Sequence, residues 1–440
     1  MSVQNGTVSP GLAETWTVSD DARHWRFRLR GGLRFHDGTA CTAESVARSL
    51  ERMARPDKGY TLGAPGVWHQ YMADAEITCE DDLTLNVRLT APLADFPEIL
   101  AQGFIAAPSM IVALDGGGTA LPCGTGPYRV LRADPDLVVA ERVDGHFRAG
   151  SGPKDVRWMR EPTAEGRRDL LVSGRAQVAI GVPSPGLDPV SGITWLRYVN
   201  PVAIIYLLNS AQGPLSDPRL RKALDLAVDR RAVVQNVLGG HAVPLHAIMP
   251  PFSQGADRPA PVAQDLPAAR RLMAEAGYAD GLTLRLDCPT RLPDEAEALT
   301  AELARQIRPL GITLDVTMHR DREAYAHMVR RKEIGDLCVF DSSPQSTFRV
   351  LYEKIDSRVR GSWWQGYANP GVESDLDLAR RTTDAEGRTA IYRGIIAGLQ
   401  DDPPWLTLYT PMKVVGLAGR HEAFRMPPDA VLDICAVPDF

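Results

Sequence analysis

The hydrophobic pattern of the first hundred residues predicts short strands around one helix. Large apolar residues alternate with arginine in Trp25–Arg30, the period-two pattern of a half-buried strand. Val46, Leu50 and Met53 then follow a helical spacing, which predicts an amphipathic helix that Thr42 can cap. The N-terminal part is therefore expected to mix strands and helices.

From about residue 200 the pattern alternates between strand and helix. The apolar run 201–208 predicts a buried strand, and Asp217 followed by Pro218 predicts the start of a helix that runs through Ala227. Further strands are predicted at 282–287, 312–318 and 337–340, and a further helix at 294–308. This succession indicates an α/β fold with a mixed or parallel sheet covered by helices.

Composition narrows the class of protein. The 440 residues are 44% hydrophobic and 24% charged, which is typical of a globular protein, and the length predicts two or three packed units. The 49 Lys and Arg against 55 Asp and Glu give a net charge of -6. This balance gives no electrostatic reason to expect a nucleic-acid partner or a membrane-surface partner.

The sequence contains no recognisable catalytic or metal-binding motif. The six cysteines form no CxxC pair, the nine histidines are scattered without an HExxH pattern, and no GxSxG segment occurs. The turn Gly124–Pro127 lacks the Gly-Lys-Ser/Thr of a phosphate-binding loop and precedes a predicted strand, so a structural turn is the better interpretation. We therefore expect a protein that is not an enzyme, with no catalytic residue, no cofactor and no bound metal.

The strongest candidate for a ligand site follows the strand predicted at 337–340. That strand leads directly into Asp341, Ser342, Ser343 and Pro344, and ligands of α/β sheets gather beyond the carboxyl ends of the strands. Asp341 suits a cationic group of a ligand, with the two serines as hydrogen-bond donors. An Asx-turn that involves Asp341 accounts for the same residues.

Aromatic residues in the next loop extend this candidate site. Trp363, Trp364 and Tyr367 lie close together outside any helical pattern, as in the walls of many ligand pockets, and we expect one of the two tryptophans to contact the ligand. Core packing is the alternative for either tryptophan. Arg349 suits a ligand carboxylate, but a solvated surface arginine is the favoured interpretation.

Several segments, in order along the chain, resemble the extracytoplasmic solute-binding proteins of family 5, which serve peptide, dipeptide, opine and nickel-chelate ABC importers. The segments are 10–16 (PGLAETW), 35–39 (FHDGT), 42–46 (TAESV), 124–128 (GTGPY), 217–224 (DPRLRKAL), 276–278 (AGY) and 366–370 (GYANP). They span almost the whole chain, and most are structural signatures, so the resemblance concerns the scaffold and not the solute.

The resemblance implies a two-lobed periplasmic-binding-protein fold (type II, similar to the large cluster C) with a hinge. Lobe I is expected at 1–205, with 405–440 returning to it, and lobe II at 206–404. Asn209, which precedes the DPRLRKAL segment, joins the expected ligand-binding residues. The implied function is solute capture by clamshell closure of the lobes, with a peptide or amino-acid-derived compound as the solute.

The same resemblance implies the partners and the location. We expect a monomer that delivers its solute to the membrane permease subunits of an ABC importer and works in the periplasm. Family members usually have a signal peptide and a first strand ahead of the segment 10–16, whereas only nine residues precede it here. A truncated exported protein is the favoured interpretation. A cytosolic ligand sensor on the same fold and, less simply, a hydrolase are the alternatives.

Overall fold

The computed structural model divides into two compact units. Unit 1 comprises Met1–Tyr198 with Lys413–Phe440, and unit 2 comprises Val199–Met412. The structure describes residues 2–4, 7–58, 67–148, 150, 152–182, 189–256, 263–291, 293–343, 346–421 and 424–437. Within these residues no helix combines the length and the apolar character that a membrane crossing requires.

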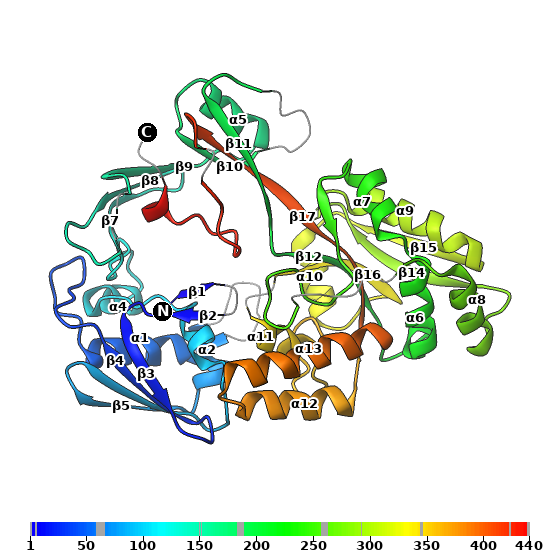
Figure 1. Ribbon diagram of the computed structural model, residues 1–440, viewed down its shortest axis with the longest axis horizontal. Helices are drawn as coiled ribbons and strands as arrows, with labels where there is room; N and C mark the ends of the chain where they lie inside the picture. Colours follow the sequence, from blue (N-terminus) through cyan, green and yellow to red (C-terminus); the bar gives the residue numbers. More distant parts are fainter. Residues whose placement is uncertain are drawn as a thin grey trace. The chain divides into compact units, whose positions relative to one another are not determined.

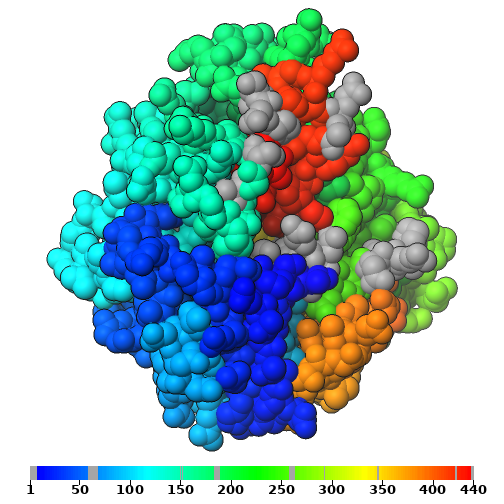
Figure 2. Space-filling view, turned by 60° about the vertical axis from the view of Figure 1, so that its left-hand side comes forward, coloured from blue at the N-terminus to red at the C-terminus, as the bar shows by residue number. Residues whose placement is uncertain are grey.

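The first part of unit 1 is a four-stranded antiparallel sheet with helices. The strand order is β3-β4-β6-β5, and this part of the surface is blue to light blue in Figure 2. Its strands and helices are β3 (Ala13–Val18), β4 (His24–Leu29), α1 (Ala43–Ala54), α2 (Val67–Met72), β5 (Glu76–Asp81), β6 (Thr84–Arg88), α3 (Phe96–Leu100) and α4 (Pro108–Asp115). A short antiparallel pair, β1 (Ser2–Gln4) and β2 (Thr7–Ser9), precedes them.

The two elements predicted for this region are confirmed. In β4 the residues Trp25, Phe27 and Leu29 are buried while the residues between them are exposed, as the alternation predicts. Thr42 caps α1, because its hydroxyl oxygen accepts a hydrogen bond from the amide of Ser45, whose own hydroxyl accepts from the Thr42 amide. Local sequence predicts both features, and pairing with β3 and β6 completes β4.

The rest of unit 1 contains two smaller groups of strands. The strands β7 (Tyr128–Ala133), β8 (Leu137–Arg142) and β9 (Asp155–Met159) form an antiparallel sheet. After α5 (Ala164–Val172), the strands β10 (Val178–Val182) and β11 (Ile193–Val199) pair with the last part of β17 (Trp405–Ala418). The GTGPY segment thus leads into β7, as expected.

Unit 2 is built on strands covered by helices (Figure 1). Its strands are β12 (Ala203–Leu208), β13 (Ala242–Pro244), β14 (Leu282–Pro289), β15 (Ile312–His319), β16 (Leu337–Ser342) and the first part of β17. Its helices are α6 (Pro218–Ala227), α7 (Arg230–Leu238), α8 (Leu266–Glu275), α9 (Ala296–Ile307), α10 (Arg322–Arg330), α11 (Thr347–Lys354), α12 (Pro370–Arg381) and α13 (Ala385–Asp401). The predicted strand–helix alternation of this region is confirmed.

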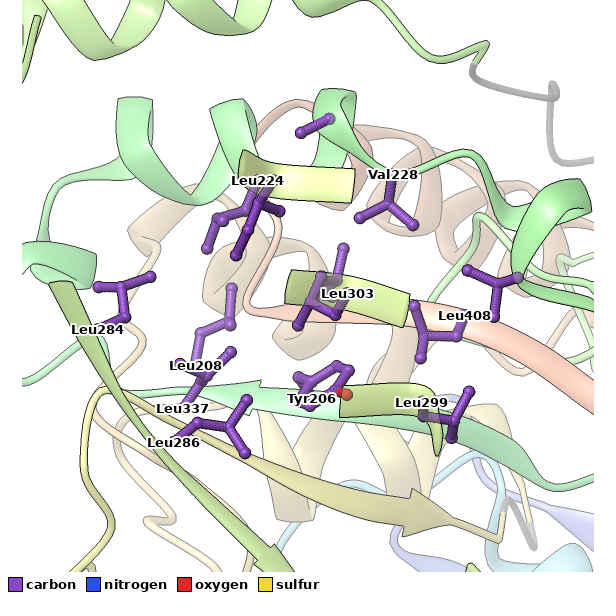
Figure 3. Packing of buried hydrophobic residues seen from close by; sticks show 14 of the residues in the cluster. Tyr206, Leu208, Leu224, Val228, Leu284, Leu286, Leu299, Leu303, Leu337 and Leu408 are labelled. Atoms are coloured by element: carbon purple, nitrogen blue, oxygen red, sulfur yellow. The ribbon is translucent and has the colours of Figure 1, made fainter. Parts of the chain in front are cut away.

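The core of unit 2 lies between the strands and the helices α6 to α9. Leucines from β14 and β16 meet leucines from α6 and α9 around Tyr206 of β12 (Figure 3). All six residues of β12 are buried, as the apolar run predicted. Each fully buried leucine of this kind contributes about 1.5–3 kcal/mol to folding, so this core holds unit 2 together.

Asp217 begins α6 as predicted, and Asp229 begins α7 in the same way. Each carboxylate accepts a hydrogen bond from a backbone amide of the first helical turn, and Pro218 occupies the first position of α6. Gly239 ends α7 in the left-handed conformation at φ 57°. These helix ends explain why the segment is a structural signature.

Residues 205 and 404, the expected lobe boundaries, both lie within unit 2, which comprises Val199–Met412. Strand pairing explains why the residues next to these positions belong to unit 2. Residues 203–208 of β12 pair with β16 along their length, and β12 also pairs with residues 405–409 of β17. These residues therefore belong to the sheet of unit 2.

Candidate functional site

Three parallel strands of unit 2 end at one edge of its sheet. β14 pairs in parallel with both β15 and β16, so their carboxyl ends lie at the same edge. Parallel α/β sheets place ligands at this edge. The polar side chains of His319, Asp341 and Ser342 stand at or near it.

Asp341 lies inside β16 and not in the following loop. The strand was predicted to end at Phe340, but pairing with β12 extends it through Ser342, with Asp341 opposite Ile204. The position of Asp341 within a paired strand does not support the Asx-turn. Its side chain is 34% exposed, and Oδ1 lies 3.4 Å from Nη2 of Arg322. Desolvation raises the pKa of Asp341, against the opposing effect of the Arg322 and Lys354 charges.

The two serines differ in their surroundings. Ser342 is buried, and its hydroxyl oxygen accepts a 2.8 Å hydrogen bond from Nζ of Lys354. Desolvation lowers the pKa of Lys354 to about 8, although the nearby Glu353 and Asp341 act in the opposite direction. Ser343 is exposed, and Pro344 lies outside the described residues. Of the two, Ser343 has the more accessible side chain.

Arg322 lies beside Asp341 in the candidate site, and sequence reasoning missed it. It is the first residue of α10, and its guanidinium carbon lies 4.6 Å from the centre of the Phe340 ring and 5.5 Å from that of Tyr325. The Tyr325 hydroxyl donates a 2.6 Å hydrogen bond to the carbonyl oxygen of Val339, which fixes that ring. The two rings and Asp341 thus set the orientation of the guanidinium group.

The aromatic loop separates into two parts. The ring of Trp363 lies 4.4 Å from that of Phe340, next to the strand that carries Asp341. Trp364 instead donates its indole N–H to the carbonyl oxygen of Tyr367 at 2.6 Å, and the Tyr367 side chain is buried. Between the two tryptophans, Trp363 is the one that adjoins the Asp341 strand.

The remaining two predicted site residues have protein partners for their polar groups. Arg349 lies in α11, only 8% exposed, and pairs with Glu353 at 2.7 Å, so the interpretation as a solvated surface arginine is wrong. Asn209 is 4% exposed. Its amide donates a 2.9 Å hydrogen bond to the carbonyl oxygen of Gly335 and accepts one from the amide of Ala211. Asn209 thus connects the end of β12 to the segment before β16, whereas the pair that Arg349 forms with Glu353 lies within α11.

The described residues contain no cluster of three or more histidine, cysteine or acidic side chains that could hold a metal ion. The six cysteines are free thiols. His319 pairs with Asp287 at 2.7 Å, but the described residues add no third ligand to them. The candidate site therefore consists of charged, hydroxyl and aromatic groups.

A family model gives the classification. The model of the bacterial extracellular solute-binding proteins, family 5, matches residues 7–349. The chain belongs to this family. The names of this family and of the similar glutathione-binding proteins describe binding proteins and not enzymes.

Curated relatives cover nearly the whole chain. The chain is 26% identical over 438 residues to the glutathione-binding protein GsiB of Pectobacterium atrosepticum, which covers 96% of this chain and 84% of that protein. It is 28% identical over 439 residues to the GsiB of Salmonella paratyphi A, with 95% and 83% covered. The resemblance predicted from the sequence motifs is confirmed.

Solved structures show the same fold. HbpA2 of Haemophilus parasuis matches with a TM-score of 0.79 and 20% identity, over 96% of this chain and 89% of that one. The periplasmic binding protein DppA of Helicobacter pylori, in complex with the peptide STSA, matches with a TM-score of 0.72 and 21% identity, over 95% and 87%. The chain thus has the predicted periplasmic-binding-protein fold of the type II, cluster C kind.

Proposed function

We propose that this solute-binding protein captures a peptide or amino-acid-derived compound for an ABC importer. The solute binds at the carboxyl edge of β14, β15 and β16, where Asp341 provides a partly exposed carboxylate. The observation that carries this proposal is the Asp341 carboxylate, held in a paired strand and flanked by the Arg322 guanidinium and by aromatic rings. Such a mixture of apolar walls and few polar groups is typical of small-molecule sites.

The relatives support the same class of solute. Their names refer to glutathione, and the fold neighbours include a complex with a peptide. In this proposal the protein works as a monomer in the periplasm, passes its solute to the permease subunits, binds no nucleic acid and performs no chemical conversion. The ligand-binding residues are Asp341, Ser343 and Trp363, whereas Ser342, Arg349, Trp364, Tyr367 and Asn209 hold the surrounding backbone and side chains.

Native mass spectrometry of the freshly purified protein is the test. We expect a stoichiometric adduct that denaturation releases as a small amino-acid-derived compound. Adding that compound at a hundred times its dissociation constant stabilises the fold by about 2.7 kcal/mol, which thermal unfolding detects. Chemical conversion of the compound, abolished by one substitution, would replace this proposal with a hydrolase, and capture of a regulatory protein without permease subunits would replace it with a sensor.

A further inference from the structure

Arg322 is held in one orientation by its surroundings. Its guanidinium group lies against the rings of Phe340 and Tyr325, and its side chain is 14% exposed. Tyr325 is itself fixed, because its hydroxyl donates to the carbonyl oxygens of Val339 and Asp287. A planar cation that is already oriented loses little entropy when it binds a planar anion.

The contact between Arg322 and Asp341 leaves most of their hydrogen-bonding capacity unused. A guanidinium group has five N–H donors, and a carboxylate accepts at both oxygens. Among the described residues the two groups share a single contact of 3.4 Å between Nη2 and Oδ1. A well-formed pair has two bonds of about 2.7–2.9 Å, so both groups can still bind a ligand.

The position of Arg322 in α10 also favours an anion. A helix N-terminus carries a partial positive charge, so a cation there is unfavourable unless an anion stands beside it. The cap residue Asp321 accepts hydrogen bonds from the amides of Glu323 and Ala324, which offsets part of this charge. Asp341 and a ligand carboxylate bound at Arg322 both add negative charge at this end of the helix.

We propose that Arg322 determines the specificity of the site by binding the carboxylate of a free α-amino acid group whose ammonium group binds Asp341. This inference rests on the proposed function and narrows it to one class of solute. A pair of opposite charges in contact matches a ligand that carries an ammonium and a carboxylate on the same carbon. An ordinary α-linked peptide separates these charges at its two ends, whereas a γ-linked glutamyl peptide keeps them together.

Two isomeric tripeptides test this inference by calorimetry. S-methylglutathione has a γ-linked glutamate, and its α-linked isomer has the same atoms and charges but no free α-amino acid group. We expect the wild-type protein to prefer the γ-linked isomer by roughly 10- to 100-fold, the effect of one charge-assisted hydrogen-bonded contact. The substitution Arg322→Met should remove the preference by weakening only the γ-linked isomer. Arg322→Lys, which keeps the charge and loses the fork, should retain a part of it.

Arg331→Met is the matched control, because it removes the same charge from an exposed residue at the other end of α10 that pairs with Glu333. It should keep the full preference. Equal binding of both isomers by the wild type, an equal loss of both in Arg322→Met, or a co-purified solute without a free α-amino acid group would each overturn the inference while leaving the proposed function in place. A protein that binds neither isomer and no other solute would overturn the proposed function as well.

Discussion

Asp341 is the residue with the most direct test. Replacing it with asparagine keeps the shape of the side chain and removes the charge that binds the ammonium group of the solute. We expect Asp341→Asn to weaken binding of S-methylglutathione by about 1–3 kcal/mol, the usual range for the loss of a charge-assisted hydrogen bond. Calorimetry at pH 7 measures the affinity of the variant for S-methylglutathione. An unchanged affinity would remove Asp341 from the site.

The pH dependence of the same binding gives an independent check on the charge. Desolvation raises the pKa of Asp341, so the carboxylate takes up a proton at a higher pH than an ordinary aspartate does. Only the ionised form attracts an ammonium group, so affinity should be full near pH 7 and fall as the pH approaches the raised pKa from above. Asp341→Asn should show a flatter profile, whereas the same steep fall in this variant would assign the titration to another group.

The sequence singled out Asp341 as a candidate site residue because it directly follows an apolar strand. Arg322 was missed because its contact with Phe340 depends on how α10 packs against β16, which no local pattern encodes. For Arg349 a local signal did exist, since Glu353 stands four residues later, at the spacing at which helical side chains pair.

At the scale of elements, the GTGPY turn of unit 1 is held by two histidine rings. Nε2 of His36 donates to the carbonyl oxygen of Gly126, and Nε2 of His146 donates to that of Thr125, both at 2.9 Å. Nδ1 of His146 accepts the amide of Arg148 at 3.1 Å, so the bonded ring is neutral. A second proton on the His146 ring would sit on Nδ1, face the amide N–H of Arg148 and break the hydrogen bond between them.

This geometry predicts that acid loosens the turn. Desolvation, together with the charges of Arg148, His36 and Arg30, lowers the pKa of His146 below its unfolded value near 6.5. A depressed histidine pKa means that the unfolded chain binds more protons, so its contribution to stability is present above about pH 6.5. That contribution is lost as the pH falls through the lowered pKa.

The substitution His146→Gln tests the prediction, because glutamine keeps a donor for Thr125 and cannot take up the proton. Hydrogen exchange at pH 5 and pH 7 follows the amides of His36 and Val143, which donate to the carbonyl oxygens of Gly124 and Pro127. Wild-type protection of these amides should decrease at the lower pH more than that of the variant. His24→Gln, which removes an exposed histidine, is the control and should behave as the wild type. Equal acid sensitivity in His146→Gln would contradict the histidine mechanism.

The starts of helices set by local signals were predicted well, whereas the end of β16, which pairing sets, was not. The first turns of α1, α6 and α7 follow from single capping residues that lie beside them in the sequence. The end of β16 was placed too early because Asp341 and Ser342 are polar residues that a strand pattern excludes. Their pairing with Ile204 and Ala203 of β12, far away in the sequence, determines where the strand ends.

At the scale of the whole molecule, the chain passes between the two units twice. The passages lie at Tyr198–Val199 and at Met412–Lys413. The second falls inside β17, a continuous strand whose first part pairs within unit 2 and whose last part pairs with β10 of unit 1. The positions of these passages depend on which strands pair, because β12 and the first part of β17 pair within unit 2.

Because the chain passes between the units twice and its cysteines are free thiols, we expect the solute to shift the population of the protein toward a closed state. A ligand changes this population only by its different affinities for the two states, so closure should follow occupancy of the Asp341 site. Small-angle scattering should therefore show a smaller radius of gyration when S-methylglutathione saturates the wild-type protein. Asp341→Asn at the same solute concentration should keep the radius of the solute-free protein, and should approach the smaller value only when more solute is added. Tight binding to the wild type with an unchanged radius would remove closure from the mechanism and leave unit 2 alone as the binding element.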